Sequence, residues 1–166
     1  MIKLFSTNNY KYIGFWDADL ATPLDEINEL LNKSKNDAIS ILMGCRIKRL
    51  GTKVERKATR HFFGRIFSTF ASIILKLPVY DTQCGAKLFR SDMDELFKEK
   101  FITKWLFDVE LLARFRNTYG TDACLNNILE VPLNVWEDKG DSKLKFTHIL
   151  KVPFELLKIR RKYNRG

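Results

Sequence analysis

The sequence predicts an α/β fold in which a mixed, mostly parallel sheet is flanked by helices. Two apolar segments suited to strands, Tyr12 to Trp16 and Ala38 to Met43, are separated by a segment with apolar residues at helical spacing. A strand, a helix and a second strand in this order are typical of a βαβ unit in a parallel sheet. With 166 residues, the chain has the length of one ordinary domain, and we expect a single domain over residues 1–166.

The first helix is predicted to start at Thr22, as the N-cap, with Pro23 at the first helical position. Its apolar face is expected to consist of Leu24, Ile27, Leu30 and Leu31. A basic loop and a long helix follow at about residues 46–77, and the inner face of this helix is expected to hold Phe63, Phe67, Phe70, Ile74 and Leu77.

The second half of the chain predicts two further strands and two further helices. The strands are expected at Ala86 to Phe89 and at Ile128 to Trp136, and between them Asp108 to Tyr119 predicts a helix that Gly120 ends. A basic amphipathic helix is expected at about residues 146–163, and we expect its inward side chains to be Ile149, Phe154 and Leu157.

Charge and cysteine content narrow the classes of partner and compartment. The formal net charge of +9 predicts an anionic partner, which can be nucleic acid, an acidic membrane surface or a phosphorylated small molecule. The three cysteines are odd in number and lack CxxC spacing, which favours a reducing compartment over a disulfide framework or a zinc site. We expect no segment that crosses a membrane, because no uncharged apolar run approaches the roughly 20 residues that a span needs.

Two acidic residues stand at the expected end of the first strand. Asp17 and Asp19 would lie at the carboxyl edge of a parallel sheet, where binding sites of such folds occur. Two carboxylates in this position can hold a hard divalent cation, which would neutralise a diphosphate. The alternative is that Asp19 only supports the turn and the start of the next helix.

Several motifs then occur in the order and spacing of one known family: FWDADLATPLDEI, MGCR, VYDTQCGAKLFR, KWLFDVELL and GDSKL. The chain resembles the inverting family 2 glycosyltransferases, and specifically the group of dolichyl-phosphate β-glucosyltransferases and dolichol-phosphate mannosyltransferases. The resemblance covers about residues 10 to 163. It implies a partial GT-A fold, the Rossmann-like fold of nucleotide-diphospho-sugar transferases.

The resemblance also implies a donor site. Asp17, Ala18 and Asp19 match the family's DxD segment, which contacts the nucleotide sugar, and Asp19 and Asp17 would hold Mg²⁺ or Mn²⁺. Arg46 matches an arginine that meets phosphate, and Lys143 matches a lysine that contacts the donor diphosphate. The alternative for Arg46 and Lys143 is that they are solvated side chains in basic loops.

For the acceptor, Arg60 matches an arginine that grips the lipid phosphate, together with Arg46. The serine expected four residues after Arg60 is Gly64 in this chain. Asp81 matches an acidic residue beside the reacting sugar, and we expect it, with Asp19, to be catalytic by positioning and electrostatics. As alternatives, Asp81 forms a turn before Gly85, and Asp108 caps a helix.

The front of the family's domain is not recognisable before Asp17. Members begin with a strand and a Pro-x-Tyr-Asn-Glu-like segment that hold the nucleotide. We therefore expect a truncated catalytic domain without its N-terminal nucleotide-binding strands, which would bind the donor weakly.

Together these features predict a hexosyltransferase that moves glucose or mannose, with inversion, from UDP-glucose or GDP-mannose to a dolichyl or undecaprenyl (polyprenyl) phosphate. We expect it to be a cytoplasmic protein, peripheral at the cytoplasmic face of a membrane and prone to self-association into a homo-oligomer through exposed aromatic residues. The alternatives are a nucleic-acid-binding module, which the helical spacing of the aromatic residues disfavours, and a non-catalytic remnant of the same fold.

Overall fold

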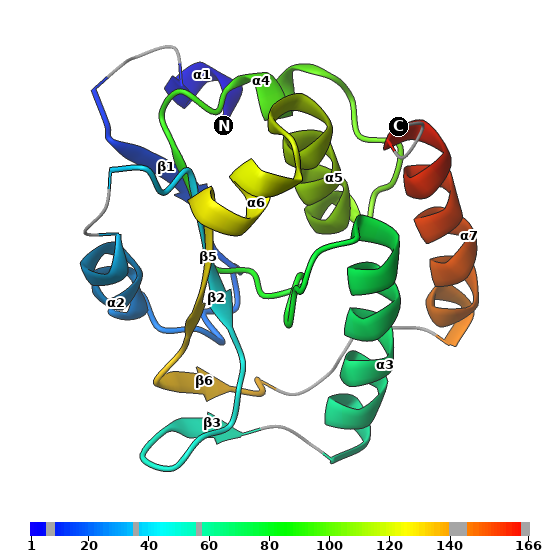
Figure 1. The fold of residues 1–166 in the computed structure, drawn as a ribbon. Helices are drawn as coiled ribbons and strands as arrows, with labels where there is room; N and C mark the ends of the chain where they lie inside the picture. Colours follow the sequence, from blue (N-terminus) through cyan, green and yellow to red (C-terminus); the bar gives the residue numbers. More distant parts are fainter. Residues whose placement is uncertain (6–8, 35–36, 56–57, 140–145, 164–166) are drawn as a thin grey trace.

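The computed structural model describes residues 1–5, 9–34, 37–55, 58–139 and 146–163 (Figure 1). The described elements, in chain order, are α1 (Ile2–Phe5), β1 (Tyr12–Phe15), α2 (Glu26–Lys33), β2 (Ile41–Cys45), β3 (Lys53–Glu55), α3 (Ala58–Leu75), β4 (Lys87–Arg90), α4 (Glu95–Lys98), α5 (Phe107–Tyr119), α6 (Thr121–Asn127), β5 (Ile128–Pro132), β6 (Val135–Glu137) and α7 (Phe146–Tyr163).

The central sheet is mixed, as the sequence predicts. Its strand order is β1-β4-β2-β5, and a second, two-stranded sheet joins β3 and β6 in parallel. Strands β1 and β2 run in the same direction, but they are not neighbours, because β4 lies between them and is antiparallel to both. The expectation of a βαβ unit in a parallel sheet is therefore wrong for the strand pairing, and β2 finds its parallel neighbour in β5.

This topology brings chain segments that are far apart in sequence to one edge of the sheet. The C-terminal ends of β1, β2 and β5 lie at the same edge as the start of β4, because β4 runs in the opposite direction. The residues that follow β1 and β2, and those that precede β4, therefore meet at this edge. They include the segments with Asp17, Arg46 and Asp81.

Apolar side chains cover both faces of the central sheet. Along β2, Ile41 and Met43 belong to one buried cluster and Leu42 to the other, as strand alternation requires. The first cluster takes in residues of α3, α5 and α7, and the second takes in Leu30 of α2. Figure 1 shows α2 on one side of the sheet and α3, α5 and α7 on the other.

Helix α2 begins later than the sequence predicts. Its N-cap is Asp25 and its first residue Glu26, so Thr22 and Pro23 lie in the preceding turn. The carboxylate of Glu26 is buried and accepts the backbone N–H groups of Asn134 and Val135, at 3.1 and 2.9 Å. Of the four expected apolar-face residues, Leu30 is buried, whereas Leu24 and Leu31 are exposed.

The inner faces of α3 and α7 also differ from the prediction. Phe63 and Phe70 of α3 are 57% and 56% exposed, and the buried side of this helix is formed by Ala71 and Leu75 with Phe67 and Ile74 packed beside them. In α7, Phe154 and Leu157 are exposed, and the buried residues are Leu156, Ile159 and Tyr163. The side chain of Ile149 lies outside the described residues.

Other predicted elements are confirmed. Helix α5 ends at Tyr119, and Gly120 follows with a φ of 88°, a conformation that glycine adopts without strain. Helix α7 has the expected bounds.

The strand expected at Ile128 to Trp136 is instead divided between β5 and β6, which belong to different sheets. All three cysteines are buried and free.

A buried polar cluster joins α7 to α5. The carboxylate of Glu110, with 0% exposure, accepts hydrogen bonds from Arg114 Nη2 and Tyr163 Oη, both at 2.9 Å, and from the backbone N–H groups of Ile102 and Thr103. Arg114 also donates to the carbonyl groups of Leu96, Glu99 and Lys100. Each buried charge is thus compensated, and the last turn of α7 is held against the helical layer.

We expect the substitution Tyr163→Phe to lower the free energy of unfolding by about 1–2 kcal/mol, because it leaves a buried carboxylate with one donor fewer. Urea denaturation followed by circular dichroism measures the change. Tyr10→Phe is the matched control, because Tyr10 is exposed. Equal stability of the two variants would show that the hydroxyl group of Tyr163 does not contribute.

Candidate active site

The core of the candidate site is an ion pair between Arg46, directly after β2, and Asp81, in the loop before β4. Nε and Nη2 of Arg46 lie 2.7 Å from Oδ2 and Oδ1 of Asp81, and the backbone N–H of Arg46 donates to Oδ2 at 3.0 Å. Both residues are buried. The planar guanidinium thus meets the carboxylate with two parallel hydrogen bonds, which is the strongest geometry for such a pair.

The surroundings keep Arg46 charged. Burial by itself opposes the charge, but Asp81 outweighs this effect and raises the pKa of Arg46 above its usual value. The guanidinium also lies over the ring of Trp136 in β6, with Cζ 5.4 Å from the ring centroid. Arg46 is therefore a fixed, charged group at the edge of the sheet.

Glu130 in β5 holds the backbone of the Asp81 loop. Its carboxylate accepts the N–H of Tyr80 at 2.8 Å and the N–H of Asp81 at 2.8 Å. Burial raises the pKa of Glu130, and these two N–H donors oppose the shift. Because Glu130 and Arg46 come from neighbouring strands, the sheet fixes both the backbone and the side chain of Asp81.

A second buried ion pair lies beside the first. Nζ of Lys87, the first residue of β4, lies 2.8 Å from Oδ1 of Asp108 and donates to the carbonyl group of Cys84. Burial raises the pKa of Asp108; Lys87 opposes this shift, whereas the charges of Asp17 and Asp81 add to it. Asp108 does not cap α5, because the N-cap is Leu106. This alternative is wrong, and Asp108 points instead to Lys87.

The Asp17 to Asp19 segment forms a tight turn at the same edge. The N–H of Leu20 donates to the carbonyl group of Asp17, the N–H of Ala21 donates to Oδ1 of Asp19, and Leu20 has a φ of 51°. Leucine rarely adopts this left-handed conformation, and such residues gather at functional sites. Asp17, Ala18 and Asp19 are all exposed.

One side chain and one backbone group hold the turn from its two ends. Nε1 of Trp16 donates to the carbonyl group of Thr22 at 2.7 Å. The backbone N–H of Glu137 donates to the carbonyl group of Ala21 at 2.9 Å. The turn therefore has a defined place next to β6, the strand that also carries Trp136.

Asp17 lies directly against the Asp81 loop. A Cβ atom on Gly85 would stand 1.9 Å from Cγ of Asp17, so only glycine leaves room for this carboxylate. Asp17 also lies near enough to raise the pKa of Arg46 and of Asp108. The structure thus brings together three of the segments that the sequence singled out: DAD, MGCR and DTQCG.

The exposed carboxylates fit a divalent cation only as part of its coordination shell. One oxygen of Asp19 already accepts a backbone N–H. Among the described residues, no group of three or more His, Cys, Asp or Glu side chains gathers as a metal site. A hard cation at Asp17 and Asp19 would need further oxygen ligands, which a diphosphate or water would supply.

Two of the expected site residues are not described at the level of the side chain. Arg60 lies in the first turn of α3, and its side chain falls outside the described part of the chain. Lys143, with its GDSKL segment, lies outside the described residues altogether. Their contacts with phosphate stay predictions.

Sequence reasoning missed Lys87 and Glu130. Both stand in apolar strand segments, AKLF and ILEVP, and a charged residue in such a segment signals a buried ion pair or hydrogen-bonded carboxylate. Lys87 is 1% exposed. The pattern indicates burial, but it does not identify the partner.

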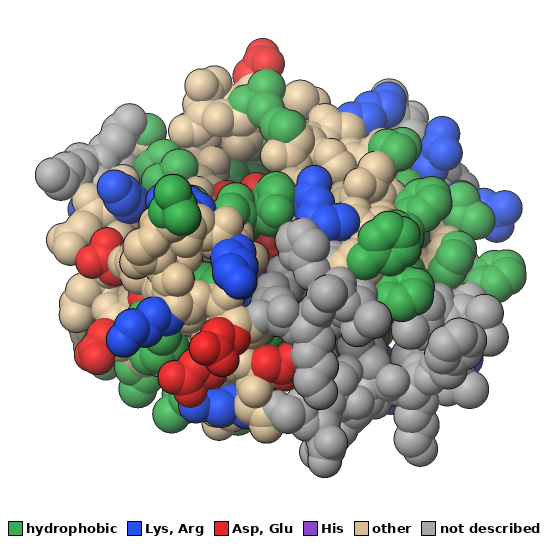
Figure 2. Space-filling view, turned by 90° about the horizontal axis from the view of Figure 1, so that it is seen from below, with side chains coloured by type: hydrophobic (Ala, Val, Ile, Leu, Met, Phe, Trp, Pro, Cys, Tyr) green, Lys and Arg blue, Asp and Glu red, His purple; other side chains and the backbone are tan. Residues whose placement is uncertain are grey.

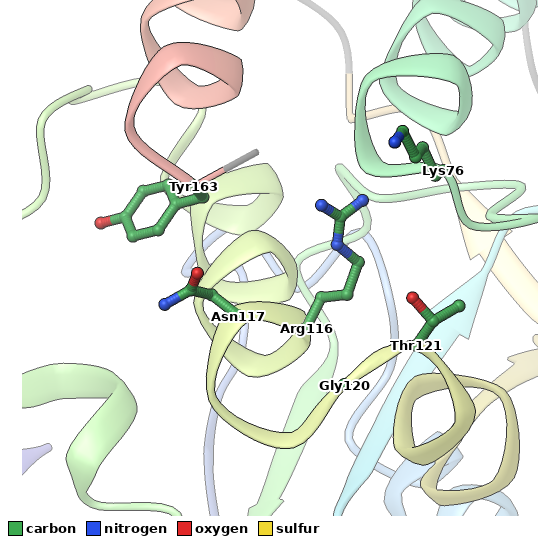
Figure 3. A pocket seen from close by; sticks show the side chains of 6 residues that line it. All are labelled: Lys76, Arg116, Asn117, Gly120, Thr121 and Tyr163. Carbon is green, nitrogen blue, oxygen red and sulfur yellow. The ribbon is translucent and has the colours of Figure 1, made fainter. Parts of the chain in front are cut away.

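A shallow hollow of about 270 Å³ lies elsewhere, where the C-terminal ends of α3, α5 and α7 meet, and is lined by Lys76, Arg116, Asn117, Gly120, Thr121 and Tyr163 (Figure 3). Nη1 of Arg116 donates to the carbonyl group of Leu75 and so caps α3. None of the six lining residues belongs to the Asp17, Arg46 and Asp81 cluster.

Known proteins are similar to this chain in sequence and in fold. The chain is 34% identical over 149 residues to the dolichyl-phosphate β-glucosyltransferase ALG5C of Trichomonas vaginalis, an alignment that covers 86% of this chain and 42% of that protein. It is 30% identical over 174 residues to the human dolichyl-phosphate β-glucosyltransferase, covering 98% of this chain and 50% of that protein. The chain belongs to the family 2 glycosyltransferases, and its curated relatives include dolichyl-phosphate β-glucosyltransferases.

A solved structure confirms the GT-A fold. Glucosyl-3-phosphoglycerate synthase from Mycobacterium tuberculosis, in complex with UDP, superposes with a TM-score of 0.61 at 16% identity, over 96% of this chain and 53% of that one. No protein-family model matches the chain. The glycosyltransferase chain spans about half the length of the curated relatives it matches.

We expect Gly85→Ala to weaken Mn²⁺ binding in the presence of UDP-glucose at least tenfold, because the new methyl group displaces the carboxylate of Asp17. The signal of free Mn²⁺ in electron paramagnetic resonance measures the binding, and near-ultraviolet circular dichroism checks the fold. A folded variant with the affinity of the parent chain would contradict the role of Asp17.

Proposed function

We propose that the protein transfers glucose, with inversion, from UDP-glucose to a polyprenyl phosphate. The observation that carries this proposal is the buried Arg46–Asp81 pair beside the exposed Asp17 and Asp19, at the carboxyl edge of a GT-A sheet. It is supported by relatives named dolichyl-phosphate β-glucosyltransferases and by the UDP complex of the structural neighbour. Because the chain spans about half the length of these relatives, the activity of the whole protein is part of this proposal.

In the proposed reaction, an oxygen of the acceptor phosphate attacks the anomeric carbon of glucose. The new carbon–oxygen bond forms as the bond from that carbon to UDP breaks, and the electron pair leaves with the diphosphate. A Mg²⁺ or Mn²⁺ ion held by Asp17 and Asp19 would offset the charge of the leaving diphosphate. No covalent enzyme intermediate is needed.

Asp81 acts by position in this proposal, because both of its carboxylate oxygens already accept hydrogen bonds from Arg46. A carboxylate in such a pair is a weak base. The acceptor needs no strong base, since a phosphate monoester has a second pKa of about 6 and is largely ionised at neutral pH. Asp81 would orient the reacting groups and hold Arg46 in place.

We expect calorimetric titration to show binding of UDP-glucose that depends on Mn²⁺ and is lost in Asp19→Ala. Asp25→Ala is the matched control, because Asp25 is an exposed acid in the same segment, with no hydrogen bond from its side chain to the helix. Binding of GDP-mannose in place of UDP-glucose would identify mannose as the sugar. Metal-independent binding that Asp19→Ala leaves unchanged would contradict the proposed metal site.

We further propose that the protein lies at the cytoplasmic face of a membrane through α3 and α7. Exposed apolar side chains on these two helices form the α3/α7 apolar surface, which consists of Phe62, Phe63, Ile66, Phe70, Ile73, Phe154 and Leu157. Figure 2 shows hydrophobic side chains gathered on the side where α3 and α7 lie, with basic side chains nearby. In α7, Lys158, Arg160 and Arg161 are exposed as well.

An apolar surface with adjacent basic residues suits the interface of an anionic bilayer. Among the described residues, no helix has the length and apolar character that a transmembrane span requires. The α3/α7 apolar surface would therefore lie in the interface and bring the site to the phosphate of the lipid acceptor.

We expect the double substitution Phe70→Ser, Phe154→Ser to reduce co-sedimentation with liposomes that contain phosphatidylserine at least fivefold. Leu125→Ser is the control, because Leu125 is about as exposed as Phe70 but lies on α6. If the double variant instead changes only the molar mass measured by light scattering, the surface serves self-association. Retention on single-stranded oligonucleotide with no liposome binding would favour the nucleic-acid-binding alternative.

A further inference from the structure

Helix α3 places a basic side chain, that of Arg65, against the Asp81 loop. The proposed reaction does not yet use this side chain. The guanidinium of Arg65 lies over the ring of Tyr80, with Cζ 3.9 Å from the ring centroid. Tyr80 directly precedes Asp81. Arg65 is thus a neighbour of the loop that forms the candidate site.

The ring beneath Arg65 belongs to a fixed backbone. Oγ of Ser68, one turn further along α3, donates to the carbonyl group of Tyr80, and the N–H of Tyr80 donates to Glu130 of β5. The segment is therefore tied to the helix on one side and to the sheet on the other. A guanidinium stacked on this ring loses little further freedom when it binds a ligand.

Arg65 has an unmet hydrogen-bond donor. Its Nη1 atom is buried and has no hydrogen-bond partner among the described residues. Such a donor is costly in a folded protein, and an unfilled one calls for a specific explanation. Because the side chain as a whole is only partly buried, a ligand can reach it. Stacking occupies the faces of the guanidinium and leaves its in-plane N–H groups for an acceptor such as phosphate.

Two of the described cations at the site already have acidic partners. Arg46 is balanced by Asp81 and Lys87 by Asp108, so each of these pairs contributes little net charge. Asp17 and Asp19 add negative charge, which the proposed Mg²⁺ or Mn²⁺ ion would neutralise. An acceptor phosphate carries a charge of about −1.5 to −2 at pH 7, and the two buried pairs do not compensate it.

We propose that Arg65 binds the phosphate group of the acceptor lipid. This inference rests on the proposed function and adds a binding residue to it. The serine that the resemblance implies four residues after Arg60 is Gly64 in this chain, and Arg65 is the next residue.

Binding of geranyl phosphate, a short and soluble polyprenyl phosphate, tests the proposal by calorimetry on the full chain. We expect Arg65→Met to weaken this binding at least tenfold and Arg65→Lys to weaken it less, because lysine keeps the charge but not the planar donors. Geraniol, which lacks the phosphate, should bind with no dependence on residue 65. Lys33→Met, at an exposed position in the last turn of α2, is the control for loss of a positive charge.

The outcomes separate this inference from the proposed function. If the parent chain and Arg65→Met bind geranyl phosphate equally, the role of Arg65 is wrong and the polyprenyl phosphate acceptor stands. If Arg65→Met weakens only the binding of UDP-glucose, Arg65 binds the donor and the inference is overturned. If the parent chain binds UDP-glucose but not geranyl phosphate, both the inference and the acceptor class are wrong. Thermal melting of each variant confirms that it is folded.

Discussion

The arrangement of the site depends on one interaction, the bidentate ion pair of Arg46 and Asp81. It joins the end of a central strand to a loop 35 residues further along the chain. Two buried charges are stable only when they are paired and hydrogen-bonded, so the pair requires the loop to lie at this edge of the sheet. Asp17 then rests against Gly85 of the same loop, and the DAD turn, which Trp16 and Glu137 hold from its two ends, acquires its place in the site.

The site is built on several buried charges rather than on an apolar floor. Lys87 and Asp108 form a second ion pair, and Glu130 holds the backbone of Tyr80 and Asp81. Replacing one partner of such a pair is more damaging than replacing both, because an unpaired buried charge remains. These groups therefore stabilise the fold only as complete sets, and they orient polar groups toward the carboxyl edge of the sheet.

Part of the site could be anticipated from residue order and local pattern, and the family resemblance added Arg46 and Asp81. An acidic pair after the first strand and an arginine after the next had to lie at one sheet edge if both strands run parallel, and they do. The contacts could not be anticipated. Asp81 accepts hydrogen bonds from Arg46 and does not only form a turn before Gly85. This contact depends on β4, which lies between β1 and β2 in the sheet and places the loop that precedes it beside both strands.

The helix faces show the same limit. Phe63, Phe70 and Phe154 have the spacing and the hydrophobicity of core residues, yet they are exposed, while Ala71 and Leu156 are buried. Periodicity indicates that a helix is amphipathic, but a helix with apolar residues on more than one side does not reveal which side meets the sheet. The packing of α3 and α7 against α5 decides it.

By itself, the sequence determined the α/β class, most of the helices and strands, and the segments that gather at the carboxyl edge of the sheet. The fold class and the elements follow from local periodicity and from the direction of the strands, whereas the family resemblance singled out the MGCR and DTQCG segments. The tertiary structure alone decided which charges pair, which face of each long helix is buried and how Arg65 lies on Tyr80. Such contacts join residues that are far apart in the sequence, 50 positions for Tyr80 and Glu130 and 109 for Glu26 and Val135, and only the packing of the whole chain brings their atoms within bonding distance.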